Sequence, residues 1–261
     1  MSLDQPQANV KQQYVTQDAF LGGELAVLQP KKGFRAGVDS VLLGASVSDA
    51  TNHLLELGAG VGVATLTALV HHPKLCAHMA ELSPEAVELC QINATNNGLS
   101  DRAKISQVDI MAKGPEREAA GLKPDHFDCV IANPPYFDDK SVSLPQDQYG
   151  AQAHAHAKHC LEKWVKVAVS AASATAEIIF IHRAEAINDL LRAYDRRIGN
   201  ISILPIVSRP GQPASRVLLR GQKGSKAPTT LLSPLHLHGE TGREFSPQVQ
   251  SILMGKAQLH W

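Results

Sequence analysis

The chain has 261 residues, of which 44% are hydrophobic and 19% are charged, and this is the composition of a globular protein. Lys plus Arg and Asp plus Glu number 25 each, so the formal net charge is zero. This balance excludes a largely disordered chain and a protein that binds nucleic acid through bulk positive charge. A local basic face remains compatible with it, because net charge says nothing about distribution.

The N-terminal residues and the cysteines predict a cytoplasmic protein without a metal site. Residues 1–14 are polar and are expected to form a disordered tail, with no signal peptide. No run of about 18 apolar residues occurs, so no membrane-spanning helix is expected. The four cysteines contain no CxxC pair, which argues against a zinc knuckle and favours free thiols in a reducing compartment.

From residue 53 onward, short apolar segments alternate with segments of helical periodicity. The expected strands are 53–57, 75–81, 103–108, 127–132 and 177–182, and the expected helices are 61–72, 84–97, 158–172 and 184–196. Ser83 is expected to cap the helix that begins at Pro84. Strands that alternate with helices predict a doubly wound α/β fold with a parallel sheet. Segments 198–207 and 216–219 predict an antiparallel hairpin at one edge of that sheet.

A glycine-rich turn, ELGAGVG at 56–62, follows the first of these strands and opens a helix. The missing side chains of Gly58, Gly60 and Gly62 let the backbone approach a ligand, and the helix N-terminus offers free N–H groups. A dinucleotide fingerprint needs its third glycine at the sixth position, which is Val63 here. A nicotinamide cofactor is therefore disfavoured.

Two acidic residues stand at the ends of the next two strands. Glu81 lies 19 residues beyond Gly62, and a carboxylate there can accept both hydrogen bonds from a ribose diol. Asp109 follows the third strand, where it could accept a hydrogen bond from an adenine amine. Either acid alone could be a surface residue at a strand end, but the glycine turn upstream favours ligand contact for both.

The tetrapeptide NPPY at 133–136 follows the apolar strand 127–132 and is the most specific signal in the chain. Two successive prolines fix the backbone and leave the Pro134 carbonyl outside any helix or sheet ladder. The Asn133 amide oxygen is a second acceptor beside it. Two such acceptors can hold a planar NH2 group and turn its lone pair toward an electrophile, while Tyr136 offers a flat face for stacking. Pro135 and Phe137 are expected to contact the same substrate.

The glycine turn, the two strand-end acids and NPPY, in this order, resemble class I S-adenosylmethionine-dependent methyltransferases that act on a planar nitrogen. The resemblance implies a Rossmann-like, seven-stranded, mostly parallel sheet with an antiparallel C-terminal hairpin. It implies that Glu56 and the three glycines lie at the cofactor, with Glu81 on the ribose and Asp109 on the adenine. No general base is demanded, because the methylated amine can lose its proton to water.

The segment before the glycine turn extends the resemblance. DAFLGG at 18–23 and GFRAGVDSVLL at 33–43 are similar to the N-terminal signature of small-domain methyltransferases related to the bacterial tRNA1(Val) adenine-N(6) enzymes. The resemblance implies one domain over 15–261, in which 15–50 closes the cofactor site of a core at 51–261. Arg35 and Asp39 are the matching polar positions, and they either contact the cofactor or form an ion pair that closes the segment.

RNA is the expected partner, and tRNA near the anticodon is the expected substrate. From Arg196 to Gly239 the chain has seven basic residues and no acidic one, which is either a scattered solvated surface or a nucleic-acid docking face that includes Arg216 and Arg220. The polar segment 138–157 is a candidate lid over the substrate.

Three alternatives remain. A protein glutamine methyltransferase also binds a planar amide NH2 at NPPY, but that class usually carries a separate N-terminal helical domain. A guanine-amine or DNA-adenine methyltransferase is a second possibility, although DNA enzymes normally add a sizeable recognition domain. A catalytically silent cofactor-binding module is disfavoured, because both the glycine turn and NPPY are intact.

Overall fold

The computed structural model describes residues 14–33, 35–135 and 149–261, without the side chains of residues 149–159. The predicted tail at 1–14 lies almost wholly outside these residues, as do Tyr136 and Phe137.

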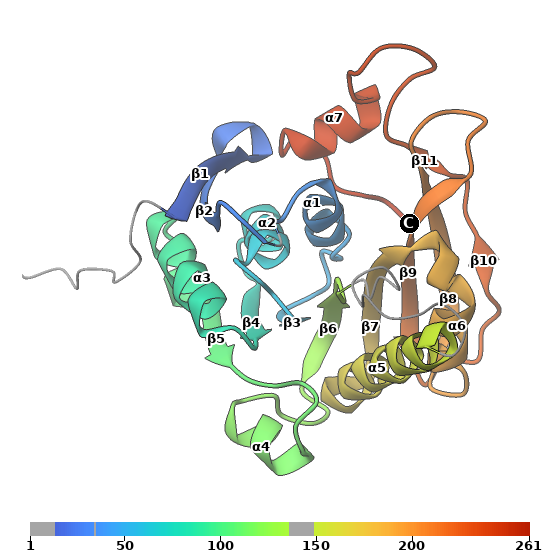
Figure 1. Cartoon of the computed structure of the whole chain (residues 1–261). Coiled ribbons are helices and arrows are strands. Elements are labelled where there is room, and N and C mark those ends of the chain that lie inside the picture. The colour runs from blue at the N-terminus through green and yellow to red at the C-terminus, as the bar shows by residue number, and fades with distance from the viewer. Residues whose placement is uncertain (1–13, 34, 136–148) are drawn as a thin grey trace, which may run out of the picture.

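One mixed β-sheet forms the middle layer, with the strand order β10-β8-β9-β7-β6-β3-β4-β5 and β11 paired to β8 (Figure 1). The parallel strands are β3 (His53–Leu57), β4 (Cys76–Glu81), β5 (Ala103–Gln107), β6 (Phe127–Ala132) and β7 (Ala172–Arg183). The hairpin of β8 (Ile198–Val207) and β9 (Ala214–Lys223) joins β7 in antiparallel pairing. The expected doubly wound α/β fold with an antiparallel C-terminal hairpin is confirmed.

Helices cover both faces of the sheet (Figure 1). One face carries α1 (Val38–Ala45), α2 (Val63–His71), α3 (Pro84–Asn96) and α7 (Pro247–Leu253), and the other carries α4 (Gly114–Ala119), α5 (Tyr149–Ala171) and α6 (Ile187–Tyr194). Each face has its own apolar cluster, and successive residues of β3 enter different clusters, Leu54 one and Leu55 the other. Burial on both faces explains why these strands are continuous apolar runs.

The segment before β3 adds a separate two-stranded sheet. β1 (Val15–Phe20) and β2 (Leu25–Pro30) pair in antiparallel fashion through a 3-10 turn at Leu21–Gly23, and β2 packs against α3. This hairpin was not predicted, because the sequences of its two strands, VTQDAF and LAVLQP, show no clear alternation of apolar and polar residues.

Most predicted elements of the core are confirmed within a few residues, and Ser83 caps α3 by accepting a hydrogen bond from the Ala86 N–H at 3.2 Å. The helix predicted at 158–172 begins earlier, at Tyr149, and the strand predicted at 177–182 begins at Ala172. Two further expectations, the number of strands and the lid, differ from the structure. The sheet has nine strands instead of seven, because β10 (Thr230–Leu231) and β11 (Leu235–His236) add parallel pairs along the outer edge of β8. Strands of two residues are too short to leave a periodic signal. The lid expected at 138–157 is wrong for its second half, since residues 149–157 belong to α5.

Within the described part of the chain, no helix is long and apolar enough to cross a membrane. All four cysteines are free thiols, and Cys76 alone among them is exposed.

Candidate active site

A cavity of about 640 Å3 opens at the carboxyl ends of β3, β4, β5 and β6. Ligands bind at this edge of doubly wound sheets, and the volume lies within the range of small-molecule sites. The lining residues come from the end of β2 and the connection after it, the glycine turn, the ends of three further strands, α3 and α5. They include Pro30, Ala36, Gly60, Glu81, Ala86, Asp109, Asn133 and Trp164.

The three glycines of the turn have three different surroundings. A Cβ at Gly60 would meet nothing within 4 Å, so the backbone there faces the cavity directly. A Cβ at Gly58 would lie 2.5 Å from Cη2 of Trp164, which packs under the turn. A Cβ at Gly62 would lie 2.8 Å from Cys90 Sγ, and Gly62 does not line the cavity. Only Gly58 and Gly60 therefore offer surface to a ligand, whereas Gly62 allows close packing of the turn against α3.

Glu56 lies beneath the cavity and does not line it. Its side chain is buried, with 3% exposed, and its Oε2 accepts hydrogen bonds from the N–H of Thr65 at 3.0 Å and from the Thr65 hydroxyl at 2.5 Å. Burial raises the pKa of Glu56 to about 8, although the two bonds from Thr65 lower it. The expectation that Glu56 contacts the cofactor is not met in this geometry, since its carboxyl ties the turn to α2.

Glu81 ends β4 with its carboxylate at the cavity wall. Oε2 accepts the N–H of Gly60 at 2.8 Å, and Oε1 accepts the N–H groups of Leu82 at 2.8 Å and Ser83 at 2.9 Å. A carboxylate has about four acceptor positions, so one on Oε2 is left by these three bonds for a ligand hydroxyl. The backbone holds Glu81 in place before any ligand arrives.

Asp109 and two apolar side chains form the far end of the cavity. Asp109 Oδ1 accepts the N–H of Met111 at 2.7 Å, and Oδ2 makes none of the hydrogen bonds found within the described residues. Leu82 is 60% exposed and Met111 is 38% exposed, and both line the cavity. Large apolar side chains at a cavity rim are suited to a flat ring between them. The sequence analysis missed both, because single apolar residues after a strand carry no distinctive signal.

Residues 133–135 of the NPPY segment follow β6 at this cavity. Asn133 and Pro135 line it, together with Cys160 and Trp164 of α5. Pro134 is buried beside them. The strand end thus brings the predicted amine-binding residues next to the predicted cofactor residues. Trp164 is 7% exposed, so it packs in the core and also lines the cavity.

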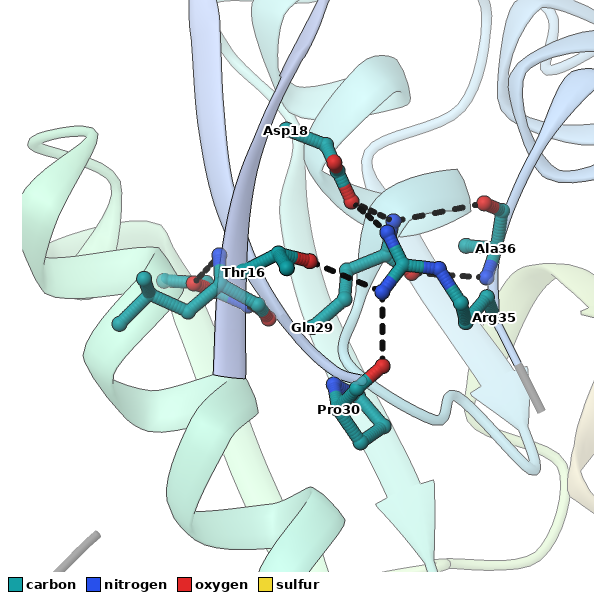
Figure 2. A network of polar contacts seen from close by, with 8 residues as sticks. Thr16, Asp18, Gln29, Pro30, Arg35 and Ala36 are labelled. Atoms are coloured by element: carbon teal, nitrogen blue, oxygen red, sulfur yellow. Dashed lines mark hydrogen bonds and ion pairs between the residues drawn. The ribbon is translucent and has the colours of Figure 1, made fainter. Parts of the chain in front are cut away.

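Arg35 closes the connection between β2 and α1 without lining the cavity. Its guanidinium donates to the Thr16 hydroxyl at 2.8 Å and to the Pro30 carbonyl at 2.7 Å, and it pairs with Asp18 (Figure 2). The buried Gln29 accepts the N–H of Ala36 at 2.8 Å and donates to Asp18 at 2.7 Å (Figure 2). Of the two roles left open for Arg35, the structure favours an ion pair that closes the segment and so positions Pro30 and Ala36.

Asp39 does not pair with Arg35 but accepts a hydrogen bond from Nε of Arg216 at 3.0 Å. This contact joins the first turn of α1 to β9, over the edge of the sheet that carries the cavity. Asp39 is not among the lining residues.

The acid-free basic stretch meets carboxylates from other parts of the chain. Besides Arg216, Arg220 pairs with Glu177 and lies 5.5 Å from the Trp261 ring centre, and Lys223 pairs with Asp125 at 2.6 Å. These cations are therefore at least partly neutralised in the fold. The role of Arg216 and Arg220 in docking RNA stays a prediction.

Among the residues that the structure describes, no three His, Cys, Asp or Glu side chains converge on one point. The residues present fit S-adenosylmethionine. Gly60 has no side chain, so its backbone leaves open space at the cavity. The Glu81 carboxylate is fixed by backbone hydrogen bonds, and the exposed side chains of Leu82 and Met111 could flank a flat ring. A doubly wound sheet with this site is that of a class I S-adenosylmethionine-dependent methyltransferase.

A family model agrees with this class. The methyltransferase small domain model matches residues 36–173, and the chain belongs to this family.

Curated relatives have similar lengths. The chain is 26% identical over 239 residues to a tRNA1(Val) (adenine(37)-N6)-methyltransferase of Porphyromonas gingivalis, which covers 88% of this chain and 91% of the relative. It is 28% identical over 207 residues to the protein of the same name in Haemophilus influenzae, covering 77% and 82%.

Solved structures share the fold. A protein described as a predicted O-methyltransferase of Agrobacterium tumefaciens superposes with a TM-score of 0.72 at 27% identity, covering 85% of this chain and 98% of that one. TYW2 of M. jannaschii in complex with AdoMet has a TM-score of 0.55 at 12% identity, over 80% of this chain and 85% of the other.

Proposed function

We propose that the protein transfers the methyl group of S-adenosylmethionine to the exocyclic N6 amine of adenine in RNA, with tRNA near the anticodon as substrate. The observation that carries the proposal is the position of Asn133 and Pro135 on the wall of the cavity that also holds Glu81 and Gly60. Relatives named as tRNA1(Val) adenine-N6 methyltransferases support the choice of acceptor.

The chemistry requires little from the protein beyond orientation. S-adenosylmethionine, when bound, supplies an electrophilic methyl group on a sulfonium. The Asn133 amide oxygen and the Pro134 carbonyl accept the two hydrogens of the target amine and direct its lone pair toward the cavity. The new N–C bond forms as the S–C bond breaks, and the amine then loses its proton to water. The target adenine must leave its stack to reach this site.

The test is methylation of separate tRNA, rRNA, DNA and protein pools with radiolabelled S-adenosylmethionine, followed by identification of the modified nucleoside or residue. Label in tRNA as N6-methyladenine is expected. Label in protein as methylglutamine, or in DNA, would contradict the proposed acceptor. Asn133→Ala should lose most of the transfer, while Asn96→Ala, a change at an exposed asparagine on α3, should not.

Arg216 and Arg220 are proposed to contact RNA phosphates, and the ion pairs offer matched controls. Arg216→Gln removes a cation, whereas Asp39→Asn breaks the same pair and leaves the cation in place. A phosphate contact predicts that only Arg216→Gln lowers the salt slope of RNA binding, by about 1. The pair Arg220→Gln and Glu177→Gln applies the same logic to Arg220. Equal effects of both members of a pair would refute the contact.

A further inference from the structure

Asn93 on α3 and Asn97, the residue that caps the C-terminus of α3, bind the backbone of β2 in the way that a neighbouring strand would. Asn93 Oδ1 accepts the N–H of Leu28 at 2.7 Å, and its Nδ2 donates to the Leu28 carbonyl at 3.0 Å. Asn97 repeats this arrangement at Ala26, with both distances at 2.9 Å. Each side-chain amide thus forms hydrogen bonds with both the N–H and the carbonyl of one residue of β2.

The spacing of the two asparagines suits this role. Residues four apart on a helix are separated by about 6.0 Å along its axis. Residues two apart on a strand are separated by about 6.8 Å and present their N–H and C=O groups to the same edge. Leu28 and Ala26 are two apart in β2, whose other edge pairs with β1, so α3 covers the only edge left (Figure 1).

Asn93 makes one more contact that Asn97 lacks. Its Nδ2 also donates to the Val61 carbonyl at 3.1 Å, and Val61 lies in the glycine turn and lines the cavity. The side chain of Asn93 is completely buried, with 0% exposed. One amide therefore joins the glycine turn to β2, whose last residue, Pro30, also lines the cavity.

We propose that Asn93 is a positioning residue for cofactor binding. Its side chain holds the N-terminal hairpin and the glycine turn at the separation that the bound cofactor needs. Asn97 anchors the same hairpin but has no bond to the glycine turn. The proposal concerns cofactor binding and holds for any methyl acceptor, so its failure is distinguishable from failure of the proposed function.

Removal of the Asn93 amide would leave three backbone groups without their partner: the N–H and the carbonyl of Leu28, which is half-buried, and the carbonyl of Val61, which is buried. Groups left in this state are costly, and the turn and hairpin would move to find new partners. Removal of the Asn97 amide also removes three hydrogen bonds, two to the half-buried Ala26 and one from its Nδ2 to the Asn93 carbonyl at 2.7 Å, but none to Val61.

The experiment compares Asn93→Ala with Asn97→Ala by calorimetric titration with S-adenosylhomocysteine, which requires no acceptor. We expect the Kd to rise about tenfold or more in Asn93→Ala and less than threefold in Asn97→Ala. Urea unfolding of both variants reports general destabilisation separately. An equal rise in both variants, or no rise in Asn93→Ala, would overturn the proposal.

A measurement on the wild-type protein covers the case in which Asn93→Ala does not fold. Amide hydrogen exchange is followed with and without S-adenosylhomocysteine. Coupling through Asn93 predicts that the ligand slows exchange at the Leu28 N–H of β2 together with the amides of the glycine turn. Protection confined to the turn, with Leu28 unchanged, would overturn the proposal.

Discussion

Alanine substitutions at two glycines of the turn, Gly60 and Gly62, should have different effects on the stability of the fold and on cofactor binding. Gly60→Ala and Gly62→Ala both place a side chain at a positive φ, +55° and +91° respectively. For Gly60 the new methyl group meets nothing within 4 Å, so its cost is the backbone conformation, about 1–2 kcal/mol. Because the methyl group enters the cavity, we expect the Kd for S-adenosylhomocysteine to rise at least tenfold.

Gly62→Ala should reduce the stability of the fold more than it reduces cofactor binding. Its Cβ would lie 2.8 Å from Cys90 Sγ and 3.1 Å from Met79 Sδ, two buried atoms that have little room to move. Overpacking adds about 1–3 kcal/mol to the backbone term, so the total loss is about 2–5 kcal/mol.

Urea unfolding and calorimetric titration of both variants test this prediction. At an m value of about 2 kcal/mol per M, the midpoint of Gly62→Ala should lie about 1 M below that of Gly60→Ala. Gly62→Ala should bind S-adenosylhomocysteine more tightly than Gly60→Ala wherever it is folded. The reasoning is refuted if Gly60→Ala is the less stable variant or binds like wild type.

Three further predictions concern charged residues of the site. Glu56 keeps its proton in the folded state between pH 4.5 and about 8, where the unfolded chain has lost it, so rising pH destabilises the fold by about 1.4 kcal/mol per pH unit. In Glu56→Gln the free energy of unfolding, measured with urea at several pH values, should lose this dependence on pH. The same pH dependence in both proteins would contradict the prediction. Arg35→Ala removes the half-exposed contact to Asp18 and should cost about 1 kcal/mol of stability, with a several-fold weaker binding of S-adenosylhomocysteine, because Pro30 loses its anchor. Glu81→Gln replaces an acceptor of three N–H groups by an amide with one acceptor oxygen, and calorimetry should show a Kd raised more than tenfold; an unchanged Kd would exclude the ribose contact.

The sequence by itself determined the parts of this protein that depend on short-range chemistry. Alternating apolar and helix-period segments predicted the core strands and helices, and Ser83 before Pro84 marked the start of α3. The strand-end positions of Glu81, Asp109 and Asn133 followed, because parallel strands in a doubly wound sheet end at the same edge.

The tertiary structure decided which of these residues face the ligand and which support it. Glu56 and Gly62 belong to the same motif as Gly60, yet one is buried under the turn and the other is packed against Cys90. A motif gives the spacing of residues along the chain but not the direction of each side chain.

Contacts between distant segments were also beyond the sequence. Arg216 and Asp39 are 177 positions apart, and Asn93 and Leu28 are 65 positions apart. A basic stretch without nearby acids resembles a docking surface until the fold brings carboxylates from other segments to it. Two asparagines on a helix resemble solvated side chains until a strand edge with unpaired N–H and C=O groups lies against them, since only burial makes that pairing necessary.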